Sequence, residues 1–272
     1  MQEKVQFTKE KETMLVTLYG RAVESQSKDP ILHDLAAEEA VRRIDYNFKN
    51  LKMSKYEILS TAARAKVFDQ WATEYLTNNN DVTVVYLGCG LDSRVFRINP
   101  PESVQWFDVD FPEVIELRHR LFPEREGYHM IGSSVTEENW LKQIPGDRPA
   151  LIIAEGLLYY LTEDEVKTLL KRLIDHFSQG QITFDAISKL YLRLQKTNVG
   201  ISATGARMKW GIGRVNELEQ WVPQVKLITK LSAMDPNMPN TKKMSGSIRL
   251  IVHILSYIPL LRDMGLMLRY QF

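Results

Sequence analysis

The pattern in this 272-residue sequence that most clearly indicates a binding site is a pair of glycines followed, about 20 residues later, by a pair of carboxylates. Gly88 and Gly90 directly follow the apolar run at 82–87, and Asp108 and Asp110 end the next apolar run. Glycine lets the backbone approach a ligand closely, and an acid about 20 residues further on can accept hydrogen bonds from both hydroxyls of a ribose. In its strand context the pattern indicates an adenosine-type cofactor.

The residues after Gly90 distinguish cofactors with phosphates from cofactors without them. A pyrophosphate loop has a third glycine where the helix N-terminus meets the phosphates, but this chain has Asp92, Ser93 and Arg94 there. The carboxylate of Asp92 would repel a pyrophosphate, whereas S-adenosylmethionine has no phosphate and tolerates acids near the loop. The residues therefore favour S-adenosylmethionine over NAD. Two interpretations of Asp92 and Arg94 stay open: they could form an ion pair that shapes the loop, or they could contact the donor.

Alternating strands and helices must position this loop. Apolar, β-branched runs predict strands, and apolar residues that recur with the helical period predict helices. The expected strands are 82–87, 104–110, 128–133, 150–155, 181–187, 225–231 and 266–272. The expected helices are 12–24, 31–45, 54–77, one each beginning near Pro112, Thr162 and Asn216, and 248–264. Ser54 and Thr162 each precede a glutamate at the spacing of a capping box.

This alternation predicts an α/β fold with an open, mostly parallel seven-stranded sheet, helices on both faces and an N-terminal helical addition. We expect a single domain over 1–272, in which 1–80 are the N-terminal helices, 81–187 the donor-binding core, and 188–272 a substrate cover with the closing strands.

Composition excludes several other classes of protein. The balance of 35 Lys+Arg against 34 Asp+Glu gives a net charge of +1, which is not the basic surplus of a nucleic-acid-binding protein. A single cysteine excludes an intramolecular disulfide, and His119, His129 and His176 lack ligand spacing, so we expect no metal. The segment 250–261 is too short to span a bilayer and reads as core or lid, and Arg118–Arg120 reads as a solvated face. We therefore expect a cytoplasmic protein that contacts neither nucleic acid nor membrane.

Three motifs resemble those of the leucine carboxyl methyltransferase superfamily, and within it the bacterial branch similar to the tetracenomycin polyketide synthesis O-methyltransferase. They are Leu87–Arg94, similar to the LGxGLDTR signature, Trp106–Ile115 and Ala154–Leu161, and weaker similarity extends the resemblance over roughly 54–272. The resemblance implies a class I methyltransferase fold that uses S-adenosylmethionine and releases S-adenosylhomocysteine.

The resemblance also implies roles for the glycines and carboxylates of the first two motifs. Gly88 and Gly90 would line the methionine part of the donor, and Asp110 would hold the ribose with Asp108 beside it. Asp110 could instead cap the helix that begins near Pro112.

The remaining implied donor residues come from other elements. Arg64 would pair with the donor carboxylate, although it could also be a solvated helix residue, and Glu155 would lie near the amino group and the sulfonium. The family often has Asp-Leu where this chain has Ser134 and Val135, so the hydroxyl of Ser134 would have to accept the adenine hydrogen bond.

The acceptor is less constrained by the sequence. A carboxylate acceptor is ionised at neutral pH and needs no base, and no His or Lys follows a donor motif. Tyr159 and Tyr160 are the candidate acceptor-site residues, and Arg207, Lys209 and Trp210 could hold an acidic acceptor or lie on the solvated surface. We expect an O-methyltransferase acting on a small acidic or polyketide-like metabolite. The alternatives are a protein C-terminal carboxyl methyltransferase and a non-catalytic adenosine-binding module.

Overall fold

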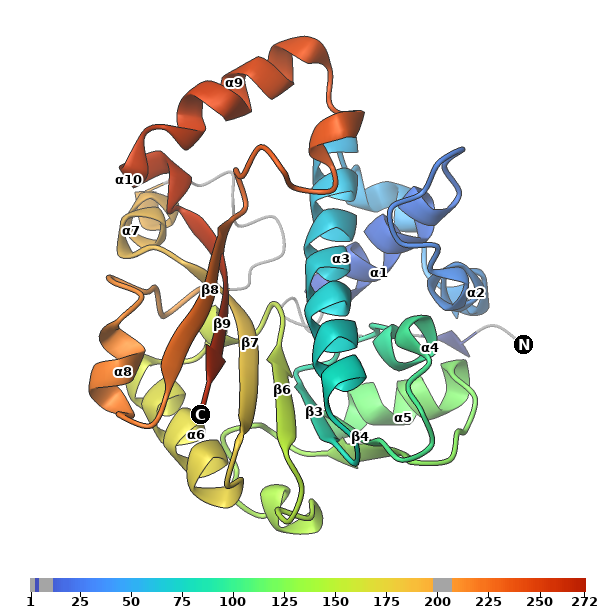
Figure 1. Ribbon diagram of the computed structural model, residues 1–272. Coiled ribbons are helices and arrows are strands. Elements are labelled where there is room, and N and C mark those ends of the chain that lie inside the picture. The colour runs from blue at the N-terminus through green and yellow to red at the C-terminus, as the bar shows by residue number, and fades with distance from the viewer. Residues whose placement is uncertain (1–2, 5–11, 198–206) are drawn as a thin grey trace.

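The computed structural model describes residues 3–4, 12–197 and 207–272, and within them the chain builds one seven-stranded sheet with the order β5-β4-β3-β6-β7-β9-β8 (Figure 1). The strands are β3 (Thr83–Leu87), β4 (Gln105–Asp110), β5 (Tyr128–Gly132), β6 (Ala150–Ala154), β7 (Gly180–Ile187), β8 (Lys226–Ser232) and β9 (Gly265–Gln271). All neighbouring strands are parallel except β9, which runs antiparallel to both β7 and β8. The predicted α/β fold with a mostly parallel sheet is confirmed.

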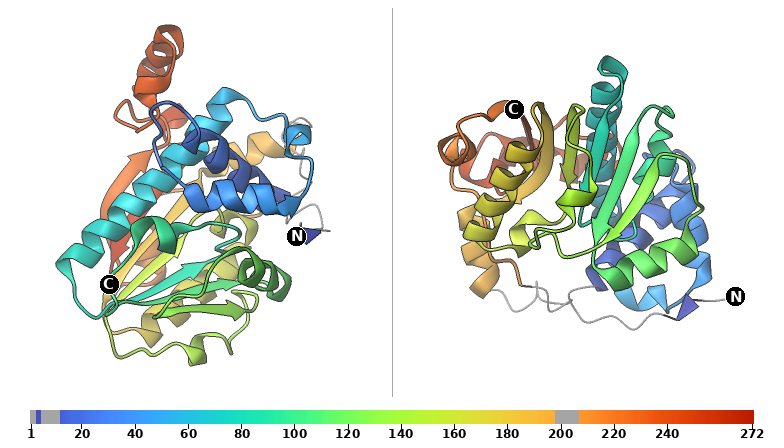
Figure 2. Two further views of the ribbon diagram at one scale, coloured as in Figure 1. Left: turned by 90° about the vertical axis from the view of Figure 1, so that its right-hand side faces the viewer. Right: turned by 90° about the horizontal axis from the view of Figure 1, so that it is seen from below.

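Helices cover both faces of the sheet, because the strands direct alternate apolar residues to opposite sides. Val85 contacts the apolar cluster that includes α6 (Glu163–His176), whereas its neighbour Val84 joins the cluster of α3 (Lys55–Asn78). Figure 2 shows these two helices on opposite sides of the sheet. The remaining core helices are α4 (Arg94–Ile98), α5 (Pro112–Leu121), α7 (Lys189–Thr197) and α8 (Glu217–Trp221). β3 and β6 are buried along their whole length, as continuous apolar runs predict.

The N-terminal helices pack at the edge of this core. α1 (Glu12–Ser25) contacts both α2 (Leu35–Arg43) and α3, and the short strands β1 (Glu3–Lys4) and β2 (Ile44–Asp45) pair in parallel beside them. Ser54 and Glu57 form a complete capping box at the start of α3, and Thr162 and Glu165 form another at the start of α6. Both predicted helix starts are therefore confirmed, because each shows the hydrogen bonds of a capping box.

The C-terminal third departs from the expectation in three places. The expected helix 248–264 is two helices, α9 (Gly246–Ser256) and α10 (Pro259–Arg262), because Pro259 cannot donate the hydrogen bond that would continue α9. α7 was not expected, since its segment lacks a clear helical start. Asn216 precedes α8 without a side-chain capping bond, and the carboxylate of Glu219 instead accepts from Leu227 N at 2.9 Å.

The segment 250–261 is also neither core nor a wall of the cavity described below, contrary to the prediction. α9 and α10 form a projection from the body (Figure 1), and most of their apolar side chains are exposed. In the described part of the chain, no helix is long and apolar enough to cross a membrane.

Candidate functional site

A cavity of about 550 Å³ lies where the parallel strands β3, β4, β5 and β6 end. Most of its wall residues come from the segments that follow these strands and from α1 and α3, and others, such as Arg207 and Lys209, lie later in the chain. The carboxyl edge of a parallel sheet is where open α/β folds bind ligands, and the volume falls within the range of small-molecule sites. The cavity wall includes all but one of the donor residues expected from the sequence, namely Arg64, Gly88, Gly90, Asp110, Ser134, Val135 and Glu155.

Gly88 and Gly90 have the backbone conformation that glycine favours, with φ of +60° and +51°. A Cβ on Gly88 would lie 2.9 Å from Leu157 Cδ1, so a side chain there would be strained by the positive φ and would also displace Leu157. Gly90 N donates to Asp110 Oδ2 at 2.7 Å, and Phe111 N donates to Asp110 Oδ1 at 2.7 Å. Each carboxylate oxygen keeps a further lone pair with which it can accept from a ligand hydroxyl. Burial raises the pKa of Asp110, against the opposing effect of these two backbone donors.

Asp108 lies outside the cavity wall, and the structure does not favour its expected place beside the ribose. Its carboxylate is buried, forms an ion pair with Arg118, and accepts from Tyr128 Oη at 2.6 Å and Trp106 Nε1 at 2.9 Å. Arg118 is itself fully buried and donates to the carbonyl of Gly90 at 2.8 Å. Asp108 and Arg118 therefore support the loop from behind.

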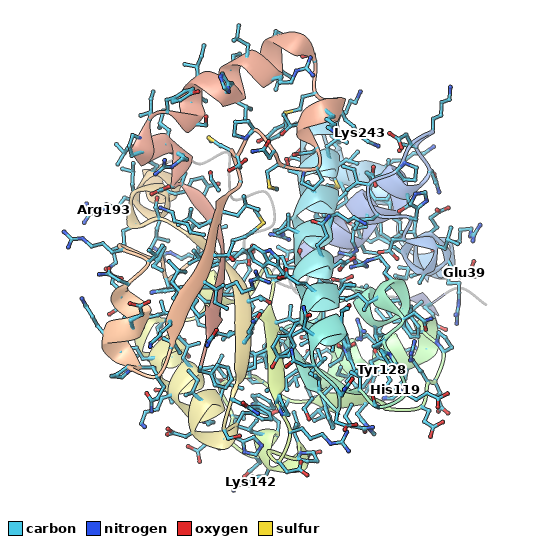
Figure 3. The ribbon with its side chains drawn as sticks, in the orientation of Figure 1. Glu39, His119, Tyr128, Lys142, Arg193 and Lys243 are labelled. Atoms are coloured by element: carbon cyan, nitrogen blue, oxygen red, sulfur yellow. The ribbon has the colours of Figure 1, made fainter. Side chains whose placement is uncertain are left out.

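The basic run at Arg118 is consequently no solvated face. The guanidinium of Arg118 points inward from α5, whereas His119 and Arg120 are exposed. Figure 3 shows His119 at this surface. The sequence interpretation was wrong for Arg118, because neighbouring residues on a helix point in different directions.

Arg64 and Glu155 contact each other across the cavity wall. Arg64 Nε donates to Glu155 Oε1 at 2.8 Å, and Arg64 Nη1 donates to Asp185 Oδ2 at 2.9 Å. The other oxygen of Asp185 accepts from Gly156 N at 2.6 Å. Burial raises the pKa of Asp185, although Arg64 opposes this shift. Asp185 was missed in the sequence, although a carboxylate within the apolar strand expected at 181–187 is a signal that could have found it.

These side chains belong to a continuous, largely buried set of ion pairs that we call the charge cluster. Arg94 pairs with Glu155, with Asp69 at 2.7 Å and with Asp92 at 3.2 Å. The loop-shaping Asp92–Arg94 pair left open by the sequence is thus present. The cluster comprises Arg21, Arg64, Arg94 and Arg97 together with Asp34, Asp69, Asp92, Glu155 and Asp185.

The charge cluster, as the described residues form it, holds four guanidinium groups and five carboxylates, so it carries one excess negative charge. Although burial disfavours ionisation of Asp92, Arg97, Arg21 and Arg94 together hold the pKa of this carboxyl well below its usual range. An excess buried charge is costly unless it is paired. A cationic ligand in the adjoining cavity would supply the missing positive charge.

The cavity wall also includes Tyr159, Tyr160, Arg207 and Lys209. The carbonyl of Tyr159 accepts from Lys209 N at 2.7 Å, which fixes the end of the irregular insertion against the site. Burial raises the pKa of Tyr159 well above its ordinary value of 10, so its phenol stays protonated at neutral pH. Trp210 is buried and packs near Trp221 outside the cavity wall.

The N-terminal helices contribute directly to the site. Met14 and Thr17 of α1 line the cavity, and Arg21 Nη2 donates to the carbonyl of Leu91 at 2.8 Å. α1 therefore forms part of the cavity wall. Among the described residues, no group of three or more His, Cys, Asp or Glu side chains could hold a metal ion.

Comparison with known proteins assigns the family of this chain. The family model for leucine carboxyl methyltransferase matches residues 14–174, which is more than half of the sequence. The chain belongs to the leucine carboxyl methyltransferase family. It is an S-adenosylmethionine-dependent methyltransferase, as the sequence motifs predicted.

Two relatives of this leucine carboxyl methyltransferase family protein are similar over most of their length. The tetracenomycin polyketide synthesis O-methyltransferase TcmP of Streptomyces glaucescens is 42% identical over 100% of both chains. The S-adenosyl-L-methionine-dependent methyltransferase dpfgK of Gibberella zeae is 34% identical over 82% of both chains. A crystal structure of a DUF574 family protein from Streptomyces avermitilis covers 95% of this chain and 96% of its own with a TM-score of 0.58 at 11% identity, which shows the shared fold alone.

Proposed function

We propose that this methyltransferase transfers the methyl group of S-adenosylmethionine to a carboxylate oxygen of a small acidic or polyketide-like metabolite. The observation that carries the choice of a carboxylate is the composition of the cavity wall, which offers cationic side chains but no histidine among its described residues. The Streptomyces glaucescens relative, named as a polyketide O-methyltransferase, supports an oxygen acceptor and a polyketide-like substrate.

The donor end of the cavity suits S-adenosylmethionine in shape and charge. Gly88 and Gly90 leave room for close approach, and the excess carboxylate of the charge cluster would balance the sulfonium or the ammonium group. Asp110 would hold the ribose hydroxyls, Arg64 the donor carboxylate, and Glu155 would lie near the ammonium group. Ser134 and Val135 line the wall where we place the adenine.

The acceptor end offers no group suited to removing a proton. The carboxylates of the wall already accept hydrogen bonds from the protein: Asp92 from Tyr86 at 2.8 Å, Asp110 from Gly90 N, Glu155 from Arg64, and Glu165 from Thr162 N at 2.7 Å. Tyr159 stays protonated, and burial raises the pKa of the Cys89 thiol as well. A phenol or alcohol acceptor would need a base, whereas a carboxylate is already ionised.

The reaction then depends on positioning. S-adenosylmethionine, when bound, would supply a methyl group attached to its sulfonium, and transfer of that methyl to the acceptor oxygen would release S-adenosylhomocysteine. The chain holds the two reactants together and excludes water, with α1 forming part of the cover, and orientation alone can lower such a barrier substantially. Arg207 and Lys209 supply positive charge for an acidic acceptor, and Tyr159 and Tyr160 flank it.

An acceptor assay with matched pairs of compounds tests this proposal. The enzyme is incubated with methyl-labelled S-adenosylmethionine and either an aromatic carboxylic acid or the corresponding phenol without the carboxyl group. We expect label on the acid only, as a methyl ester from which mild alkali releases methanol. Alkali-stable ethers from the phenols, or transfer only to peptides ending in a free carboxylate, would overturn the proposal. Donor binding is measured separately, so a wrong acceptor panel is distinguished from a failed cofactor site.

A further inference from the structure

The projection formed by α9 and α10, which we call the C-terminal arm (residues 246–262), is the largest feature of the molecule that the methyltransferase site does not use. It extends beyond the body (Figure 1). Seven large apolar residues on it are 42% to 72% exposed, namely Ile248, Leu250, Ile251, Ile254, Tyr257, Ile258 and Leu260. Only Val252 of α9 is buried.

Apolar residues extend around more than half of the helix. At 3.6 residues per turn, the apolar positions between 248 and 258 span an arc of roughly 220°. Val252 faces the body, while Leu250 and Ile254 lie on the opposite side and remain in water. A helix that is apolar on both sides is normally buried between two bodies, and the described residues of this chain supply only one of them.

The exposed area is large enough for a specific interface. Seven side chains of this size at these exposures present several hundred Å² of apolar surface, as much as the largest patch on a typical monomer. A standard interface buries about 800 Å² per partner around such an apolar centre. Leaving this surface in water would make the protein prone to aggregation.

The charges on the arm favour a protein partner over a lipid surface. Between residues 246 and 258 the only charged side chain is Arg249, and it lies with His253 on the narrow polar stripe of α9. The next cations are already paired, Lys243 with Glu24 at 3.4 Å and Arg262 with Asp263 at 3.1 Å. Helices that lie on anionic membranes carry several Lys and Arg along a strongly charged face, which α9 lacks.

The partner surface must itself be largely apolar, and the exposed face of the arm in a second copy is such a surface. Twofold symmetry would bring the arm of each copy against the apolar surface around the arm of the other, so that one self-complementary patch forms the whole interface.

We propose that the C-terminal arm is a homodimerisation element that packs against a second copy of this chain. The proposal is independent of the acceptor, because no residue of the arm lines the donor cavity.

The mass of the full-length protein in solution tests this proposal. Sedimentation equilibrium between 1 and 100 µM should give twice the 31.5 kDa chain mass for the wild type. The double variant Leu250→Asp/Ile254→Asp should sediment as a monomer with an unchanged far-ultraviolet circular dichroism spectrum, because both side chains are exposed in the single chain. Ile228→Asp is the matched control, since Ile228 is 41% exposed on the edge strand β8 and should leave the dimer intact.

Hydrogen–deuterium exchange provides a second measurement that identifies the buried surface. Amides of α9 should exchange slowly at 100 µM and faster on dilution, while those of α2 should not depend on concentration. A wild type that stays monomeric at 100 µM, a dimer that survives the double variant, or a dimer lost in Ile228→Asp would each overturn the proposal. A monomer that sediments with anionic phosphatidylglycerol vesicles, and loses this in the double variant, would assign the arm to a membrane surface instead.

Discussion

The guanidinium of Arg64 is anchored by Asp185, with 2.9 Å between Arg64 Nη1 and Asp185 Oδ2, so a residue of β7 fixes an arginine that we assign to the donor. Asp185 also accepts from Gly156 N, and it therefore orients two parts of the cavity wall at once. The acid itself does not line the cavity, which makes it a positioning residue.

Asp185→Asn should weaken donor binding about tenfold, because hydrogen bonds to charged groups contribute about 1.5–3 kcal/mol. Calorimetric titration with S-adenosylmethionine measures the effect, and KM for the donor should rise more than kcat falls. Asp175→Asn is the matched control, since Asp175 pairs with Lys171 on the exposed face of α6. An unchanged donor Kd in Asp185→Asn would remove the positioning role.

The two neighbouring acids at the end of β4 should behave in opposite ways. Asp110→Asn should raise the donor Kd at least tenfold with a modest loss of stability, because the side chain faces the cavity. Asp108→Asn should lower the free energy of unfolding by about 3–5 kcal/mol, because it leaves the buried Arg118 without its carboxylate. Urea unfolding and calorimetry on both variants separate these effects, and equal changes in both would contradict the assignment.

Donor affinity should fall on acidification before the fold is lost. Burial raises the pKa of Asp110 and Asp185, so these carboxylates take up protons, and stop acting as charged acceptors, above the pH at which an ordinary aspartate would. The pKa of Asp69 and of Asp92 is lowered, so their contribution to stability is present above about pH 4 and is lost only as the pH falls through their lowered values. Calorimetric titrations with S-adenosylmethionine from pH 8 downward measure the donor Kd. In Asp110→Asn this Kd should depend less on pH in the acid range.

Gly88→Ala should destabilise the protein by about 1–2 kcal/mol, because a side chain at positive φ is strained. It should also weaken donor binding, since the new methyl group meets Leu157 in the cavity wall. Gly246→Ala is the control, because a Cβ there meets nothing within 4 Å. Thermal unfolding of both variants measures the difference, and a Gly88→Ala protein that melts like Gly246→Ala would refute the steric argument.

Removing the positive charges at the acceptor end should weaken binding of the acceptor and leave binding of the donor unchanged. Arg207→Gln combined with Lys209→Gln should raise KM for an acidic acceptor about tenfold or more, because each charged hydrogen bond contributes about 1.5–3 kcal/mol, and leave the donor Kd unchanged. Arg214→Gln is the control, since Arg214 is exposed and outside the cavity wall. An equal loss of donor affinity would mean that these side chains shape the whole cavity.

The sequence predicted the parts of the fold that local patterns determine. The seven strands and the starts of α3 and α6 followed from apolar runs and capping boxes, and these were found within a few residues of the expected bounds. The glycine loop and its acids could be placed because the parallel topology brings successive strand ends to one edge. Residues 198–206, part of the expected substrate cover, lie outside the described residues.

Features that depend on tertiary contacts could not be predicted. The burial of Arg118 and the anchoring by Asp185 require knowing which charges meet, and spacing along one helix or strand does not contain that information. The exposed C-terminal arm was mistaken for core or lid because its composition is that of a buried helix. Composition shows that a surface needs covering, but it does not show what covers it.

The charge cluster draws its members from positions 21 to 185, and so it links the folding of α1, α3 and α4 to that of β6 and β7. A partly folded chain that has not yet added β7 would hold Arg64 without one of its two carboxylates, and one without α1 would leave Asp34 and Asp92 short of a cation. Such states are penalised by several kcal/mol per unpaired buried charge. The N-terminal helices (1–80) and the donor-binding core (81–187) should therefore fold cooperatively as one unit. Removing the N-terminal helices should destabilise the fold as well as abolish the activity.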